Sequence, residues 1–174
     1  MELIRITNSQ DPLLAQIPAL YESAFPPEAR FPTDRYLRLI DQLPQMAFHV
    51  IATNGICQGM AVWWDLGSFC FFEYLAMLPA YRCQGLGTEV LQTLLNRFDK
   101  PILGEVEPPV TEIQKRRMDL YRRNGFCMVT DPAILNSYHP DNPLWLITSR
   151  PLEDVDGCQR TIISDVYEVV GINM

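Results

Sequence analysis

Hydrophobic and polar residues along the first third of the chain recur with the spacings of strands and helices. The pattern predicts a strand over residues 3–7, helices over 11–24 and 33–42, and strands over 46–53 and 56–64. Asn54-Gly55 separates the last two segments, and this dipeptide is a strong signal for a tight hairpin turn. We therefore expect a long β-hairpin after two N-terminal helices.

The rest of the chain begins with an almost unbroken apolar segment, FCFFEYLAML, at residues 69–78. Such a run is typical of a strand that is covered on both faces. Beyond it, the pattern predicts a helix over 86–98, a strand over 102–107, a helix over 111–124, strands over 126–130 and 144–148, and a last helical segment over 152–170. A polar loop around Tyr138 is expected between the last two strands. This order of elements predicts one α/β domain with a mixed sheet.

Composition argues against several classes of function. A net charge of −7 disfavours general nucleic-acid binding, which needs a basic face. The five cysteines are scattered without a CxxC pair and the two histidines stand far apart, so we expect neither a metal site nor a disulfide framework. We also expect a cytoplasmic protein without a membrane partner, because the chain has no membrane-spanning apolar run and no signal-peptide pattern.

The basic residues are unevenly distributed along the chain. Five of them crowd one short predicted helix, namely Lys115, Arg116, Arg117, Arg122 and Arg123. A local basic patch on an acidic protein suits a small anionic ligand better than a polyanion. The acidic remainder of the chain favours a cationic second substrate.

A glycine-containing turn follows the apolar strand and opens the next predicted helix. Its pattern is Arg82-x-x-Gly85-x-Gly87. Glycines let backbone N–H groups approach a ligand closely, and a helix N-terminus adds unpaired N–H groups and a positive dipole, so the turn could hold a phosphate. The alternative is a strand-to-helix turn without a ligand. A Walker A loop would need a lysine after the glycines, and a dinucleotide fingerprint would need Gly or Ala at Val90; neither pattern fits.

Two segments together resemble a known family. They are Pro79-Ala80-Tyr81-Arg82-Cys83-Gln84-Gly85-Leu86-Gly87 and Leu120-Tyr121-Arg122-Arg123-Asn124-Gly125-Phe126. In order and separation they resemble the two signature elements of the GNAT superfamily of acetyl-CoA-dependent N-acyltransferases. The resemblance covers the chain from Leu3 to about Thr148 and implies a single domain over 1–150, with a mixed, mostly antiparallel sheet flanked by helices. The C-terminal segment over 151–174 lies outside the resemblance, and we expect it to be a helical extension packed on the same domain.

The resemblance also implies acetyl-CoA as the co-substrate. Backbone amides of the glycine turn would hold the pyrophosphate, and the preceding strand would pair with the pantetheine arm through main-chain hydrogen bonds. The residues assigned to the coenzyme are Leu75, Ala76, Met77, Leu78, Arg82, Cys83, Gln84, Gly85, Leu86, Gly87, Thr88, Gln114 and Arg117. Relatives often have glycine in place of Cys83 and asparagine in place of Gln114.

Acetyl transfer needs a base for the amine and an acid for the leaving thiolate. The resemblance places Tyr121 as the acid, and a phenol with a pKa near ~10 stays protonated at neutral pH. Glu73, the charged residue within the apolar strand, is either the general base, directly or through water, or the partner of an arginine in an ion pair.

Glu105 and Glu107 are further candidates for the base, because period-2 alternation places both on one face of the strand over 102–107. Arg117 lies on the inward stripe of the basic helix. We expect it to pair with Glu105 and so to position the helix that carries Tyr121.

The acceptor site is expected in the loops around residues 25–31 and 138–139, where Glu28, Arg30, Tyr138 and His139 are candidate contacts. The predicted function is transfer of an acetyl group to a primary amine of a small molecule or peptide by direct attack in a ternary complex. A non-catalytic acyl-CoA-binding module of the same fold is the alternative. The segment over 152–170 could also form a homodimer, and the fold alone does not choose the acceptor.

Overall fold

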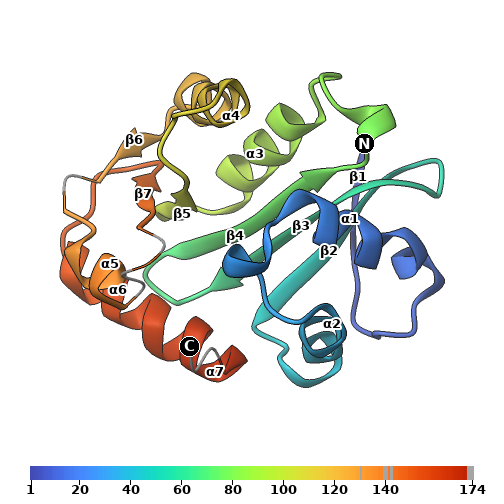
Figure 1. Cartoon of the computed structure of the whole chain (residues 1–174), viewed down its shortest axis with the longest axis horizontal. Helices are drawn as coiled ribbons and strands as arrows, with labels where there is room; N and C mark the ends of the chain where they lie inside the picture. The colour runs from blue at the N-terminus through green and yellow to red at the C-terminus, as the bar shows by residue number, and fades with distance from the viewer. Residues whose placement is uncertain (130, 139–140, 142, 172–174) are drawn as a thin grey trace. The chain divides into compact units, whose positions relative to one another are not determined.

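A computed structural model describes residues 1–129, 131–138, 141 and 143–171 of the chain (Figure 1). The strands are β1 (Glu2–Arg5), β2 (Met46–Thr53), β3 (Ile56–Asp65), β4 (Cys70–Met77), β5 (Ile102–Val106), β6 (Cys127–Met128) and β7 (Trp145–Thr148). The α-helices are α1 (Ile17–Ala24), α2 (Thr33–Gln42), α3 (Leu86–Arg97), α4 (Glu112–Arg123), α5 (Ala133–Tyr138), α6 (Val155–Ile162) and α7 (Glu168–Val170). Shorter helical turns are η1 (Pro12–Gln16), η2 (Pro27–Ala29), η3 (Pro79–Tyr81) and the π-helical η4 (Ile163–Tyr167).

The strands form a mixed sheet with the order β1-β2-β3-β4-β5-β7-β6. β4 and β5 run parallel. The pairs β1–β2, β2–β3, β5–β7 and β7–β6 are antiparallel. The predicted mixed, mostly antiparallel α/β fold is therefore confirmed.

The β2–β3 hairpin forms where the sequence predicted it. Asn54 and Gly55 have φ values of 51° and 76°, so both central residues of the turn are in the left-handed region. A two-residue turn of this kind matches the twist of the strands on either side. Thr53 therefore pairs with Ile56 directly across the turn.

The chain forms two compact units that alternate along the sequence. The first unit contains Met1–Asp65 and Glu73–Val90, and the second contains Leu66–Phe72 and the described residues from Leu91 onward. Within the first unit, α1 contacts β3 and α2 contacts β2. No helix among the described residues is both long and apolar enough to cross a bilayer.

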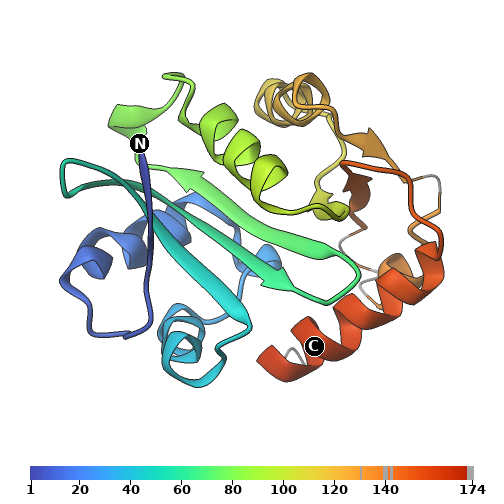
Figure 2. The same cartoon turned by 180° about the vertical axis from the view of Figure 1, so that it is seen from behind.

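The predicted C-terminal helical segment is present, although it begins later than expected. Figure 2 shows α6, η4 and α7 (red) as one continuous helical run. Ile162, Val166 and Val170 are fully buried in the single chain. The apolar face of the segment is thus already covered without a second copy, and dimerisation through it stays a prediction.

One predicted loop is in fact a helix. Tyr138 was expected in a polar loop, but it is the last residue of α5. The amide oxygen of buried Gln159 accepts a hydrogen bond from the backbone N–H of Leu135 at 3.0 Å, and its amide NH₂ group donates to the carbonyl of Asp131 at 2.9 Å. Gln159 lies in α6, which follows α5 only after the strand β7, so the sequence around α5 could not indicate these contacts.

Candidate active site

The glycine turn joins the end of β4 to the start of α3 through η3. Residues 82–85 are exposed, and Gly85 has a φ of 85°. Arg82 and Gln84 fold back on the preceding turn, where they donate to the carbonyls of Met77 at 3.0 Å and Ala80 at 2.8 Å. Among the described residues, the consecutive backbone N–H groups of residues 83–88 have no hydrogen-bond partner. The turn therefore offers a series of N–H donors at a helix N-terminus, which is a favourable place for a phosphate.

Cys83 shows why glycine suits this turn. Its φ of 60° is in the left-handed region, where a side chain is strained. The Cys83 side chain is exposed and its thiol is free. Position 83 thus requires a left-handed backbone conformation, and the side chain contributes little to the turn.

The edge of β4 carries the second segment assigned to the coenzyme. The register between β4 and β5 covers Cys70–Phe72 against Ile102–Gly104. In the described chain, this register does not extend to Leu75–Leu78. The later part of β4 thus keeps main-chain groups that β5 does not pair, as an added strand would require.

Gly59, which the sequence analysis did not single out, lets β3 approach this same part of β4. A Cβ at Gly59 would lie 2.3 Å from the carbonyl oxygen of Ala76. A glycine inside a strand is a general signal of close backbone approach, so the pattern could have indicated it.

Glu73 is half-buried and held by two neutral donors. The hydroxyl of Tyr36 and the indole N–H of Trp64 each donate to Oε2 of Glu73 at 2.7 Å. Burial and the nearby charge of Glu73 raise the pKa of Tyr36 well above its ordinary value, so the phenol remains a donor. These two bonds orient the carboxylate, and both expectations for Glu73, a general base or the partner of an arginine, stay predictions.

An aromatic cluster surrounds Tyr36, and the sequence analysis did not predict it. Tyr21 stacks on Tyr36 with ring centroids 5.2 Å apart, and Phe31 stacks on it at 5.5 Å. Tyr74 meets Tyr36 edge-on at 5.4 Å, and its ring lies 4.6 Å from that of Phe25. The cluster joins both helices of the N-terminal part to the strand that carries Glu73.

The loop after α1 is fastened to this cluster. The hydroxyl of Tyr74 donates to the carbonyl of Ala29 at 3.2 Å. Arg30 donates to the carbonyl of Phe25 at 3.1 Å, so its guanidinium shapes the loop. The acceptor role predicted for Arg30 stays a prediction, and the side chain of Glu28 and all of His139 lie outside the described residues.

Tyr121 lies on the buried side of α4 and is 9% exposed. Its ring meets Phe126 in a T-shaped contact at 5.7 Å. Burial raises the pKa of Tyr121 to about 12, although the charge of Arg117 acts in the opposite direction. Within the described part of the chain its hydroxyl has no hydrogen-bond partner. The phenol can therefore donate a proton to a ligand, because no described protein group accepts its hydrogen bond.

The expected pairing of Arg117 with Glu105 is wrong. Arg117 instead pairs with Glu107 at 2.6 Å, and both side chains are partly exposed. Glu107 follows Val106, the last residue of β5, so the alternation of the strand no longer fixes its direction. Glu105 remains within the strand and accepts a hydrogen bond from Tyr167.

Gln114 has a structural role at the start of α4. Its Oε1 accepts from the N–H of Thr111 at 2.8 Å and of Val110 at 3.1 Å, while the Thr111 hydroxyl accepts from the N–H of Gln114 at 3.3 Å. This reciprocal arrangement is a capping box. The amide oxygen is thus engaged, which leaves the NH₂ group for the predicted coenzyme contact.

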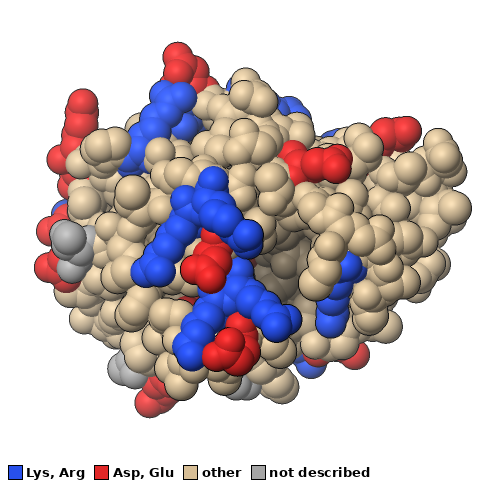
Figure 3. Space-filling view, turned by 90° about the horizontal axis from the view of Figure 1, so that it is seen from above, with Lys and Arg blue, Asp and Glu red and all other residues tan. Residues whose placement is uncertain are grey.

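The other basic residues of α4 lie on its exposed side. They are Lys115, Arg116, Arg122 and Arg123. In Figure 3, Lys and Arg side chains gather on one face with acidic side chains among them. On α4 itself, the Lys115 ammonium pairs with Glu112 at 2.8 Å. Part of the positive charge of this helix is therefore balanced locally.

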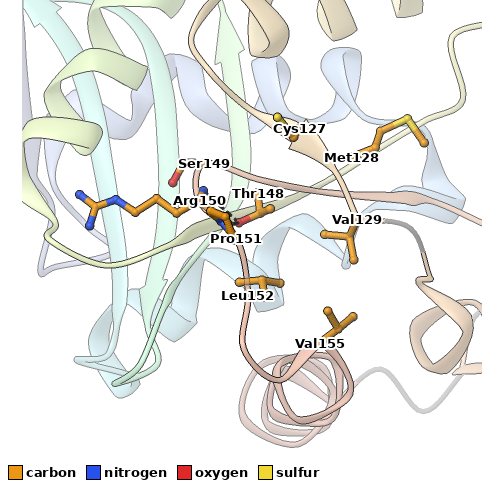
Figure 4. A pocket seen from close by; sticks show the side chains of 9 residues that line it. All are labelled: Cys127, Met128, Val129, Thr148, Ser149, Arg150, Pro151, Leu152 and Val155. Carbon is orange, nitrogen blue, oxygen red and sulfur yellow. Dashed lines mark hydrogen bonds between the residues drawn. The ribbon is translucent and has the colours of Figure 1, made fainter.

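A separate cavity of about 250 Å³ lies within the second unit (Figure 4). It is lined by residues 127–129, 148–152 and 155. None of the predicted site residues lines it. The described residues also contain no group of three or more His, Cys, Asp or Glu side chains that could hold a metal ion.

Comparisons with known proteins identify the family of the chain. The profile of the acetyltransferase (GNAT) family matches residues 14–126. The structure resembles that of a Bacteroides thetaiotaomicron protein assigned to the GNAT family of acetyltransferases, with a TM-score of 0.82 and 26% identity over 96% of this chain and 98% of that chain. No curated protein sequence matches the chain.

Two further structures share the fold at lower identity. One is a GNAT-family acetyltransferase from Elizabethkingia anophelis with acetyl-CoA bound, with a TM-score of 0.52 and 18% identity over 66% of this chain and 82% of that one. The other is the spermidine N-acetyltransferase of Vibrio cholerae, with a TM-score of 0.62 and 13% identity over 85% and 94%. The family profile covers more than half of the chain and the fold agrees with it, so the chain belongs to the GNAT family of acetyltransferases.

Proposed function

We propose that this protein transfers the acetyl group of acetyl-CoA to a primary amine. The observation that carries the proposal is the series of N–H donors at residues 83–88, at the N-terminus of α3, which no described residue pairs. Phosphate oxygens are well matched to such donors, and the unpaired edge of β4 at Leu75–Leu78 suits the amide groups of a pantetheine arm. The acetyl-CoA bound to the Elizabethkingia anophelis structure supports this choice of donor.

The proposed reaction is a direct attack by the amine on the thioester. The neutral amine nitrogen forms a C–N bond with the acetyl carbonyl carbon, and the C–S bond breaks. Glu73 takes the proton that the amine loses, directly or through a water, and Tyr121 gives a proton to the departing thiolate. The carboxylate of Glu73 is oriented by Tyr36 and Trp64, and burial keeps the Tyr121 phenol protonated.

The alternative, a domain that binds acyl-CoA without turnover, is less well supported. A binding module needs no proton donor, and the hydroxyl of Tyr121 is not engaged by any described group.

A direct test combines binding with turnover. We expect acetyl-CoA to raise the melting temperature, because a ligand of the native state shifts the unfolding equilibrium. We also expect the protein to release free coenzyme A thiol when spermidine or simple alkylamines are added. A melting temperature that acetyl-CoA leaves unchanged would contradict the donor assignment. Binding without thiol release across the amine panel would favour the non-catalytic module.

We further propose a cytoplasmic location. All five cysteines are free thiols, and Cys83 and Cys127 are exposed. A reducing compartment keeps such thiols from oxidising. Alkylation of the exposed thiols of Cys83 and Cys127 in intact cells would support the location, and recovery of the protein with disulfides would contradict it.

A further inference from the structure

Two fully buried side chains converge on one oxygen of Glu73. The hydroxyl of Tyr36, on α2, and the indole N–H of Trp64, on β3, both donate to Oε2 at 2.7 Å. All three residues belong to the first unit of the chain. Because the donors come from two different elements, together they restrict the carboxylate on β4 to one orientation.

This arrangement has two possible explanations. Glu73 could serve only as an acceptor for two buried donors, or the donors could hold Glu73 for its own chemistry. A neutral amide would satisfy buried donors at a lower desolvation cost than a carboxylate. The chain uses that solution elsewhere, where the fully buried amide of Gln159 pairs with two backbone groups. The carboxylate at position 73 therefore indicates a use for the charged group itself.

Packing holds the ring of Tyr36 in place. Tyr21 and Phe31 both stack on it, with interplanar angles of 8° and 11°, and Tyr74 meets it edge-on. Aromatic contacts of this kind fix a ring in one position. The hydroxyl of Tyr36 therefore has a fixed location, and the carboxylate that accepts its hydrogen bond is held there.

Both donors are neutral groups. Burial, and then the charge of Glu73, raise the pKa of Tyr36 well above its ordinary value, and an indole N–H is a donor only. A lysine or arginine at either position would place a full positive charge beside the carboxylate and would favour its anionic form more strongly, which weakens a base. Neutral donors orient a carboxylate with a smaller effect of that kind.

We propose that Tyr36 and Trp64 are positioning residues for the acetyl transfer, which hold Glu73 in the orientation in which it takes the proton of the amine. This inference rests on the proposed function, in which Glu73 is the base. The N–H bond of the amine breaks and an O–H bond forms on the carboxylate, directly or through a water, while the two donors keep their own protons. Proton transfer requires a defined geometry between base and proton, so each donor raises kcat through Glu73.

Removing one donor at a time tests the proposal. Tyr36→Phe and Trp64→Phe each keep an aromatic ring, and we expect each to lower kcat about tenfold, because a small misplacement of a catalytic group is costly. The KM values for acetyl-CoA and for the amine should stay within about twofold, since the donors act through Glu73 on the chemical step. Melting curves and active-site titration correct for any loss of folded protein.

Trp63→Phe is the matched control for the tryptophan. Trp63 is also buried and precedes Trp64 on β3, so strand alternation directs it to the opposite face. Its ring stacks on that of His49, with centroids 3.9 Å apart. Trp63→Phe should therefore cost stability and leave kcat unchanged.

A double-mutant cycle with Glu73→Gln separates positioning from a structural role. Glu73→Gln leaves no carboxylate to orient, so adding Tyr36→Phe or Trp64→Phe should change the residual kcat by less than about twofold. The glutamine oxygen still offers an acceptor to both buried donors, so this variant should fold. A purely structural role would lower kcat by the same factor in both backgrounds.

The outcomes distinguish the inference from the proposed function. Equal losses of kcat with Glu73 and with glutamine, or a rise in KM at constant kcat, would overturn the positioning roles and leave the transfer reaction in place. Full kcat in Glu73→Gln would also overturn them, because another group would then be the base. Absence of thiol release from the wild-type protein with every amine tested would overturn both proposals.

Discussion

The glycine turn lies in the first unit, whereas Tyr121 and Tyr167 lie in the second unit. The turn carries its polar groups on the backbone, and the two tyrosines carry theirs on side chains. The turn at residues 82–88 presents backbone N–H groups, and its side chains at Arg82 and Gln84 fold back on the protein. In the second unit, by contrast, the polar groups are single side-chain atoms: the hydroxyl of Tyr121, and the carboxylate of Glu105 with the Tyr167 hydroxyl that donates to it. The first should therefore respond to changes in backbone shape, and the second to the loss of one functional group.

The largest expected effect is at Tyr121. Tyr121→Phe removes the proton donor without changing the packing against Phe126. We expect kcat to fall by about 10²–10⁴-fold, the usual range for a general acid, with little change in the dissociation constant of acetyl-CoA. Steady-state kinetics together with calorimetry measure the two quantities. An unchanged kcat would remove Tyr121 from the chemistry.

The next effect concerns the pH dependence of stability. The pKa of Glu105 is raised to about 7 in the folded protein by burial, whereas the unfolded chain loses this proton near pH ~4.3. Between these values the unfolded state binds fewer protons, so the free energy of unfolding should fall as pH rises from about 4 to about 7, by on the order of 1–3 kcal/mol, and then level off. Denaturant titrations at several pH values measure the slope, which Glu105→Gln should lack. Parallel curves for the two proteins would contradict the burial of this carboxyl group.

A smaller effect tests the backbone character of the turn. Gly85 and Gly67 have φ values of 85° and 76°, and a Cβ at either would have no neighbour within 4 Å. Gly85→Ala and Gly67→Ala should therefore each cost about 1–2 kcal/mol of stability through backbone strain alone. We expect acetyl-CoA affinity to weaken about tenfold in Gly85→Ala and to stay unchanged in the Gly67→Ala control. Equal affinities in both variants would show that the turn does not hold the coenzyme.

The smallest effect is expected at Cys83. Cys83→Gly relieves a left-handed residue with a side chain, so stability should rise by up to about 1 kcal/mol, partly offset by the greater chain entropy of glycine. Acetyl-CoA affinity should not change, because the backbone N–H is retained. Thermal melts with and without acetyl-CoA measure both. A large loss of affinity would mean that the thiol itself contacts the ligand.

The sequence indicated the elements whose signals are local. The Asn54-Gly55 turn, the apolar run that became β4 and the glycine turn before α3 each depend on residues within a few positions of one another. Turn geometry and periodicity follow from steric rules that act over that range. The element order and the two signature segments then led to the correct family.

The sequence also singled out Glu73, Glu105 and Arg117, but it could not assign their partners. Glu73 is held by Tyr36 and Trp64, and Arg117 pairs with Glu107. These partners come from other elements, or from just beyond a strand end where alternation no longer applies. Side-chain direction there is decided by packing, which a local pattern does not encode.

By itself, then, the sequence determined the fold, the family and the backbone turn, because local sterics and hydrophobic periodicity specify them. Only the tertiary structure decided which groups surround each carboxylate. Tyr167 meets Glu105 across 62 positions of sequence, through a π-helical turn that no periodicity predicts. Contacts between residues so far apart in sequence depend on how whole helices and strands pack. That packing, which no local pattern encodes, is the physical reason why only the tertiary structure decides these partners.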